Sequence, residues 1–189
     1  MSDSAAKHRA RQTVVNLVLA LAASIALVAL VVISVPRDES NRIKPVAYDN
    51  IVNQAKSATG LNFIRIKAPT GWWCNLAQLN TSSNDAVINF KAGFVGSNTK
   101  YIGYTQAFDA NPTWLAFKLN TLTPTGDYKN WKIYQSIMKN DPPKTNDYTM
   151  VLQYSSNNYV LLYGVADESE LQAFADEISL RLQDGTVID

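Results

Sequence analysis

The chain contains 189 residues, with 17 basic and 16 acidic side chains, one cysteine and one histidine. This balanced charge gives no electrostatic reason to expect a nucleic-acid partner. The lone cysteine excludes an intramolecular disulfide, and the lone histidine, His8, precedes a long apolar segment. Imidazole-based catalytic pairs and His-ligated metal sites are therefore excluded from everything downstream of that segment.

The apolar segment, 13–35, runs for 23 residues without a charge. At ~1.5 Å per residue, a helix of this length crosses the ~30 Å hydrocarbon core of a bilayer. The preceding tail, 1–12, is basic through Lys7, Arg9 and Arg11, whereas the residues just after the segment carry both signs. This asymmetry predicts a cytoplasmic tail, one transmembrane helix in the plasma membrane and an extracytoplasmic remainder.

A cleaved secretory signal is the rival interpretation, because Ala20-Leu21-Ala22 resembles a signal-peptidase site. The apolar run, however, continues for 13 residues beyond Ala22. A cleavable signal has an apolar core of roughly 7–15 residues, so we expect an uncleaved signal-anchor that stays in the lipid bilayer.

Residues 36–44 are short, charged and polar, and they end at Pro45, which is typical of a juxtamembrane linker. Residues 45–189 have the usual size of a single domain with its own core. Tyr48, Ile51 and Ala55 recur at helical spacing, which predicts a first helix between Pro45 and Gly60.

Seven later segments alternate apolar and polar residues, as strands with one buried face do. They cover 61–67, 72–79, 88–94, 102–108, 131–137, 148–154 and 159–163. The clearest pair is 88–94 and 102–108, which the turn Gly96-Ser97-Asn98 joins into a hairpin. Thr123 to Asn130 is expected to be a loop.

Two further helices carry recognisable start signals. Asn111 before Pro112 is a cap followed by a first-turn proline, and Asp167 with Glu170 forms a capping-box pattern before the apolar stripe that ends at Leu182. Hairpins dominate and crossover helices are few, so the class is α+β. We expect one domain with an antiparallel sheet of about seven strands and helices packed on it.

Aromatic residues are the main candidates for a binding site. Trp72, Trp73 and Trp131 lie on or beside expected strands, so the core is their first interpretation. The alternative is an aromatic ligand face of Trp72, Trp73, Trp114 and Trp131 that stacks on cell-wall sugars. Cys74 is expected to be a buried, unreactive thiol.

Ordered landmarks also indicate a family. They are Ala68-Pro69 with Trp72-Trp73, Ala92-Gly93-Phe94, Tyr101 to Gln106, Trp131 after a glycine-containing loop, and Tyr159 to Ala166 leading into the capped helix. With them, 45–185 resembles an actinobacterial family of exported single-pass proteins, domain of unknown function family 4245 (DUF4245). The resemblance implies location and architecture, and it carries no catalytic, cofactor or metal residues.

These observations predict a non-catalytic protein-interaction module of the bacterial cell envelope, with an envelope protein or a cell-wall component as its partner. In layout the domain also looks like the exported photosystem accessory proteins of the PsbP type, most of which bind partners. A cell-wall carbohydrate-binding domain is the first alternative. An envelope hydrolase acting through carboxylates or a Ser-Lys pair is the second. No cofactor and no metal ion are expected.

Overall fold

The computed structural model describes residues 3–34, 44–81, 86–97, 100–138 and 144–184. Its internal contacts divide the chain into two compact units, Met1–Arg42 and Ile43–Asp189. Of the expected linker 36–44, only Lys44 falls within the described residues.

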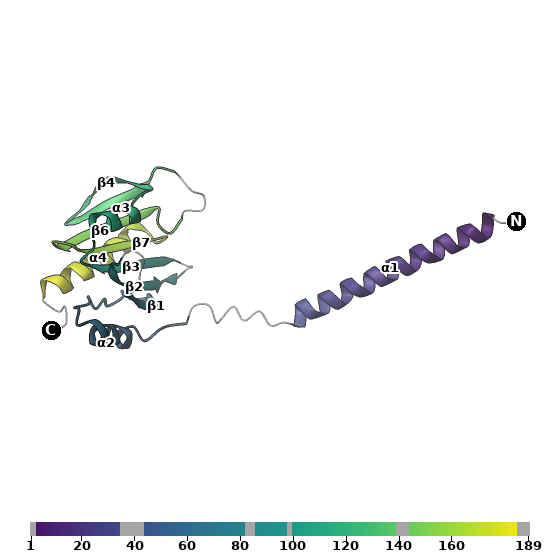
Figure 1. Ribbon diagram of the computed structural model, residues 1–189, viewed down its shortest axis with the longest axis horizontal. Helices are drawn as coiled ribbons and strands as arrows, with labels where there is room; N and C mark the ends of the chain where they lie inside the picture. Colours follow the sequence, from purple (N-terminus) through teal and green to yellow (C-terminus); the bar gives the residue numbers. More distant parts are fainter. Residues whose placement is uncertain (1–2, 35–43, 82–85, 98–99, 139–143, 185–189) are drawn as a thin grey trace. The chain divides into compact units, whose positions relative to one another are not determined.

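The first unit is a single helix, α1 (Asp3–Ser34), drawn in purple in Figure 1. Within it, the 21 residues from Arg11 to Val31 are long and apolar enough to cross a membrane. Every side chain in this stretch is exposed. The helix begins before the apolar segment does, so the basic residues of the tail continue the same helix.

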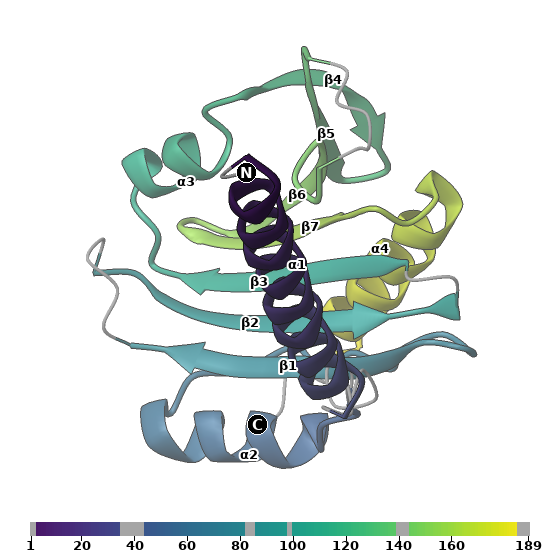
Figure 2. The same cartoon turned by 90° about the vertical axis from the view of Figure 1, so that its right-hand side faces the viewer.

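The second unit contains one seven-stranded sheet in which every neighbouring pair of strands is antiparallel. The strands are β1 (Trp73–Asn80), β2 (Ile88–Val95), β3 (Tyr101–Phe108), β4 (Leu122–Tyr128), β5 (Trp131–Ser136), β6 (Tyr148–Ser155) and β7 (Asn158–Gly164). Their order across the sheet is β1-β2-β3-β7-β6-β5-β4 (Figures 1 and 2). Together with three helices, this sheet confirms the predicted α+β class.

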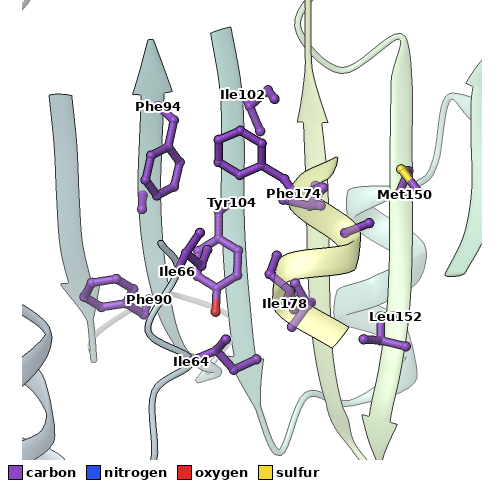
Figure 3. Close-up of a cluster of buried hydrophobic side chains, with 14 of the residues drawn as sticks. Ile64, Ile66, Phe90, Phe94, Ile102, Tyr104, Met150, Leu152, Phe174 and Ile178 are labelled. Atoms are coloured by element: carbon purple, nitrogen blue, oxygen red, sulfur yellow. The ribbon is translucent and has the colours of Figure 1, made fainter. Parts of the chain in front are cut away.

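One face of the sheet carries the main core. Alternate residues of each strand point into it, and they meet α4 (Glu168–Gln183) and α2 (Tyr48–Thr59). Figure 3 shows Phe174 and Ile178 of α4 among Phe94, Ile102 and the other labelled side chains of this cluster. Both helix residues are fully buried. The apolar stripe predicted for the last helix is therefore its contact with the sheet.

The helix ends follow the predicted local chemistry. Gly60 ends α2 with a φ of 70°, a left-handed conformation that glycine adopts without strain. The Asn111 side chain accepts the Trp114 N–H at 2.8 Å and caps α3 (Pro112–Lys118). Asp167 and Glu170 form the capping box of α4, in which Glu170 Oε2 accepts the Asp167 N–H at 2.9 Å.

The strand expected at 61–67 is wrong. Ile64 and Ile66 are buried as their alternation predicts, yet this segment has no place in the sheet. It lies against the helix-covered face instead, and the Ile64 N–H donates to the side-chain oxygen of Gln106 at 3.0 Å. An alternating pattern indicates only that every second residue is buried. An irregular segment can bury every second residue as well as a strand can.

The loop expected at Thr123 to Asn130 is also wrong, because most of it is β4. This edge strand pairs with β5 through a tight turn in which Lys129 takes a φ of 54°. Its register shifts between Pro124 and Gly126. Edge strands tolerate proline and a bulge. For this reason the composition of this segment predicted a loop although the segment forms a strand.

Gln106 on β3 is fully buried, and its amide is bonded on both sides. Its oxygen accepts from the Ile64 N–H and from the Tyr104 hydroxyl, at 3.0 and 2.8 Å. Its nitrogen donates to the Asn62 carbonyl at 3.2 Å and to the Tyr154 hydroxyl at 2.9 Å. One side chain therefore ties the irregular segment to two strands of the sheet.

Replacing Gln106 with methionine keeps the approximate volume and removes these four hydrogen bonds. Because a buried polar group left without a partner costs roughly 1–3 kcal/mol, the free energy of unfolding should fall by at least about 2 kcal/mol. Urea unfolding of the full-length chain in detergent micelles measures this loss. Gln78→Met, on the exposed side of β1, is the matched control and should change stability by less than about 0.5 kcal/mol. Equal midpoints for the two variants would contradict the network.

Candidate functional site

The sheet face opposite α4 is only partly covered. Trp114 and Leu119, at α3, pack there against Ala107, Val151 and Leu161 in a second, smaller hydrophobic cluster. Over β1, β2 and the adjoining half of β3, no helix among the described residues of this unit covers the sheet; in Figure 2, α4 lies behind these strands. We call this surface the open face. Its side chains are Trp73, Leu76, Gln78, Lys91, Tyr101 and Tyr163.

Two glycines form the floor of the open face. Gly93 of β2 lies opposite Gly103 of β3, and Gly103 lies opposite Tyr163 of β7. A Cβ at Gly103 would overlap the ring of Tyr163, and a Cβ at Gly93 would lie 3.0 Å from the ring of Tyr101. The tyrosine rings therefore lie across positions that lack side chains, an arrangement by which aromatic residues cover glycines in sheets.

Polar atoms accompany the two rings. Burial, together with the nearby Tyr163 phenol, raises the pKa of Tyr101 to about 12, so its hydroxyl stays protonated at neutral pH. The Tyr163 hydroxyl lies 3.4 Å from Thr105 Oγ1. Asn75 Oδ1 is shielded from solvent and has no hydrogen-bond partner among the described residues. The open face therefore combines aromatic rings with hydroxyl groups, while the unpaired oxygen of Asn75 lies beneath its surface.

Trp73 and Leu76 give the open face its exposed apolar surface, with 37% and 45% of their area accessible. Both come from β1, which carries no charged residue. Two exposed apolar side chains on an uncharged strand at the edge of the sheet make this surface a candidate interaction site.

The other three tryptophans lie elsewhere. Trp131 is buried in the main core and donates its Nε1–H to Ser179 Oγ at 3.0 Å. Trp72 is half-buried, with its ring edge-on to Phe174 at 5.3 Å between centroids. Trp114 is buried in the second cluster under α3. Of the four tryptophans proposed as a ligand face, only Trp73 belongs to the open face.

Cys74 is buried on the helix-covered side, and its Sγ–H donates to the Leu76 carbonyl at 3.0 Å. Burial raises the pKa of this thiol, which keeps it protonated and poorly nucleophilic. Among the described residues, no three His, Cys, Asp or Glu side chains group in a way that could hold a metal ion.

Sequence reasoning missed the two tyrosines. The available signal was the pair of glycines inside predicted strands, Gly93 and Gly103, since an interior glycine marks a place that another group approaches closely. The ring that covers Gly103 could not be predicted from the sequence, because it depends on which strand lies beside β3.

Comparison with known proteins identifies the family. Residues 9–178 match the family model described as a protein of unknown function, DUF4245. The chain belongs to the DUF4245 family. The match includes both the apolar helix and the open face, and it confirms the family predicted from the landmarks, while the actinobacterial origin stays a prediction. No curated protein and no solved structure matches this DUF4245 protein.

Gly103→Ala tests the tyrosine arrangement. The added methyl group must displace the Tyr163 ring, so we expect an altered near-ultraviolet circular dichroism spectrum and a loss of about 1–3 kcal/mol of stability, as overpacking typically costs. Gly126→Ala is the control, because nothing lies within 4 Å of its added Cβ. The arrangement is wrong if both variants keep the parent spectrum and melting temperature.

Proposed function

We propose that this DUF4245 protein is a single-pass membrane protein of a bacterial cell envelope. In this proposal its second unit is a non-catalytic protein-interaction module, held outside the plasma membrane, that binds another envelope protein through the open face. The observation that carries the proposal is the exposed pair Trp73 and Leu76 on the uncovered part of the sheet.

The composition of the open face favours a protein partner. Tryptophan and tyrosine are enriched at the energetic centres of protein interfaces, where they are surrounded by a polar rim. Here Trp73 and Leu76 stand next to the polar side chains of Gln78 and Lys91, which occupy neighbouring positions of the same face. A partner that covers Trp73 would gain a favourable free energy of about 25 cal/mol for each Å² of apolar surface removed from water.

The first unit supports membrane attachment. Its 21-residue apolar stretch matches the hydrocarbon thickness, and every side chain of this stretch is exposed. The basic residues before this stretch favour a cytoplasmic N-terminus. The module would then face the cell wall.

A carbohydrate partner is the second candidate, and one observation favours it. Trp73 is 37% exposed, and the polar side chains of Gln78 and Lys91 occupy neighbouring positions of the same face. An exposed aromatic ring with polar groups beside it suits a sugar, which offers hydroxyl groups and an apolar ring face.

Site-specific photo-cross-linking separates the two candidates. With p-benzoylphenylalanine in place of Trp73, we expect one discrete protein adduct in intact cells, which the added Leu76→Glu change should abolish. Leu180 is the control position, because it is 48% exposed on α4, which packs on the opposite face of the sheet. Equal adducts from both positions would contradict a specific partner. Loss of protein adducts together with retention of the purified chain on isolated cell wall would favour the carbohydrate candidate.

Reporter fusions test the orientation. A reporter that works only outside the cytoplasm should be active after Asp189 and inactive before Met1. Neutral substitutions at Lys7, Arg9 and Arg11 should weaken this difference, since they remove the basic flank that favours a cytoplasmic N-terminus. Activity of a cytoplasm-specific reporter fused after Asp189 would overturn the orientation.

A further inference from the structure

A small polar pocket of about 180 Å³ lies where the open face meets α3. Four strands supply its floor. Lys91 of β2 lies opposite Thr105 of β3, and Tyr163 of β7 lies opposite Thr149 of β6. Lys118, from the last turn of α3, completes the wall. Residues distant in the chain therefore converge on one cavity.

The pocket holds two positive charges, those of Lys91 and Lys118, and no carboxylate is among the described residues that line it. Within the described part of the chain, neither lysine forms an ion pair, and Lys118 Nζ lies 5.3 Å from the Trp114 ring centre. Lys100 and Lys129, by contrast, each bind a carboxylate of α4 or its cap at 2.6 Å. The lysines of the pocket thus retain their capacity to bind an anion.

Hydroxyl groups accompany these charges. Thr105 and Thr149 are each only 3% exposed. The Thr105 Oγ1 to Tyr163 hydroxyl distance and the Thr149 Oγ1 to Asn146 carbonyl distance are both 3.4 Å. Hydroxyl hydrogen bonds are usually about 2.7–2.8 Å long, so these contacts are weak and the donors can turn toward a ligand.

We propose that this pocket binds a phosphate group, either inorganic phosphate or the phosphate of a monoester. A phosphate monoester carries about −1.5 to −2 charges at pH 7, which two ammonium groups balance. Lysine serves as a point charge for phosphate, whereas planar carboxylates are best matched by the arginine fork, and no arginine is among the described lining residues.

The size of the pocket limits the ligand further. Sites for drug-sized ligands occupy roughly 300–1,000 Å³, so the smaller volume here suits one charged group rather than a whole nucleotide. Any remainder of a monoester would extend out over the open face. This inference goes beyond the protein partner proposed above and does not depend on it.

Isothermal titration of the full-length chain in non-ionic detergent tests the proposal, with inorganic phosphate, glycerol 3-phosphate and acetate as probes. We expect saturable phosphate binding that weakens as salt is added and as the pH falls from 7.5 to 5, where phosphate loses its second charge. Lys91→Gln and Lys118→Gln should each weaken binding at least tenfold. Lys132→Gln, an exposed lysine of β5 outside the pocket, should not.

Two further readouts keep the test decisive. Without phosphate, both pocket variants should melt close to the parent temperature, because neither lysine forms an ion pair among the described residues, and so weaker binding cannot be blamed on unfolding. Tighter binding of glycerol 3-phosphate supports a monoester, and tighter binding of phosphate supports the free ion. No saturable binding of either probe, equal binding of acetate, or an equal loss in Lys132→Gln would overturn the proposal.

Discussion

The buried amide of Gln106 is the interaction on which the rest of the second unit depends. An amide at this depth is tolerated only with its hydrogen bonds made, and all its partners come from the irregular segment and from two strands. It therefore fixes the path of the chain between α2 and β1, which brings Phe63, Ile64 and Ile66 into the main core.

The two faces of the sheet carry different kinds of side chain. Because side chains alternate along a strand, Gln106 and Tyr104 point toward α4 while Thr105 and Gly103 point the other way. Most of the large aromatic side chains of the core gather on the first face, while Trp114 lies in the smaller cluster on the second. The second face also carries glycines, threonines, tyrosines and Lys91, and α3 covers only part of it. Packing thus leaves the partly uncovered surface to which both proposals assign a ligand.

Local sequence signals predicted much of this fold. The apolar helix, the three helix caps and the β2–β3 hairpin each depend on neighbouring residues, and each was predicted correctly. The segment around Ile64 was not, because a side-chain oxygen rather than a neighbouring strand accepts its N–H. The site was beyond prediction for a related reason. Lys91, Lys118 and Thr149 meet only because β7 lies between β3 and β6.

The central claim is that the open face is covered by a partner in the cell. Hydroxyl-radical footprinting measures this directly by comparing side-chain oxidation in intact membranes and in the detergent-purified chain. We predict that Trp73 and Leu76 are oxidised in the purified chain and protected in membranes, while Leu180 on α4 is oxidised in both and Trp131 in neither. Equal oxidation of Trp73 in the two preparations would contradict the account.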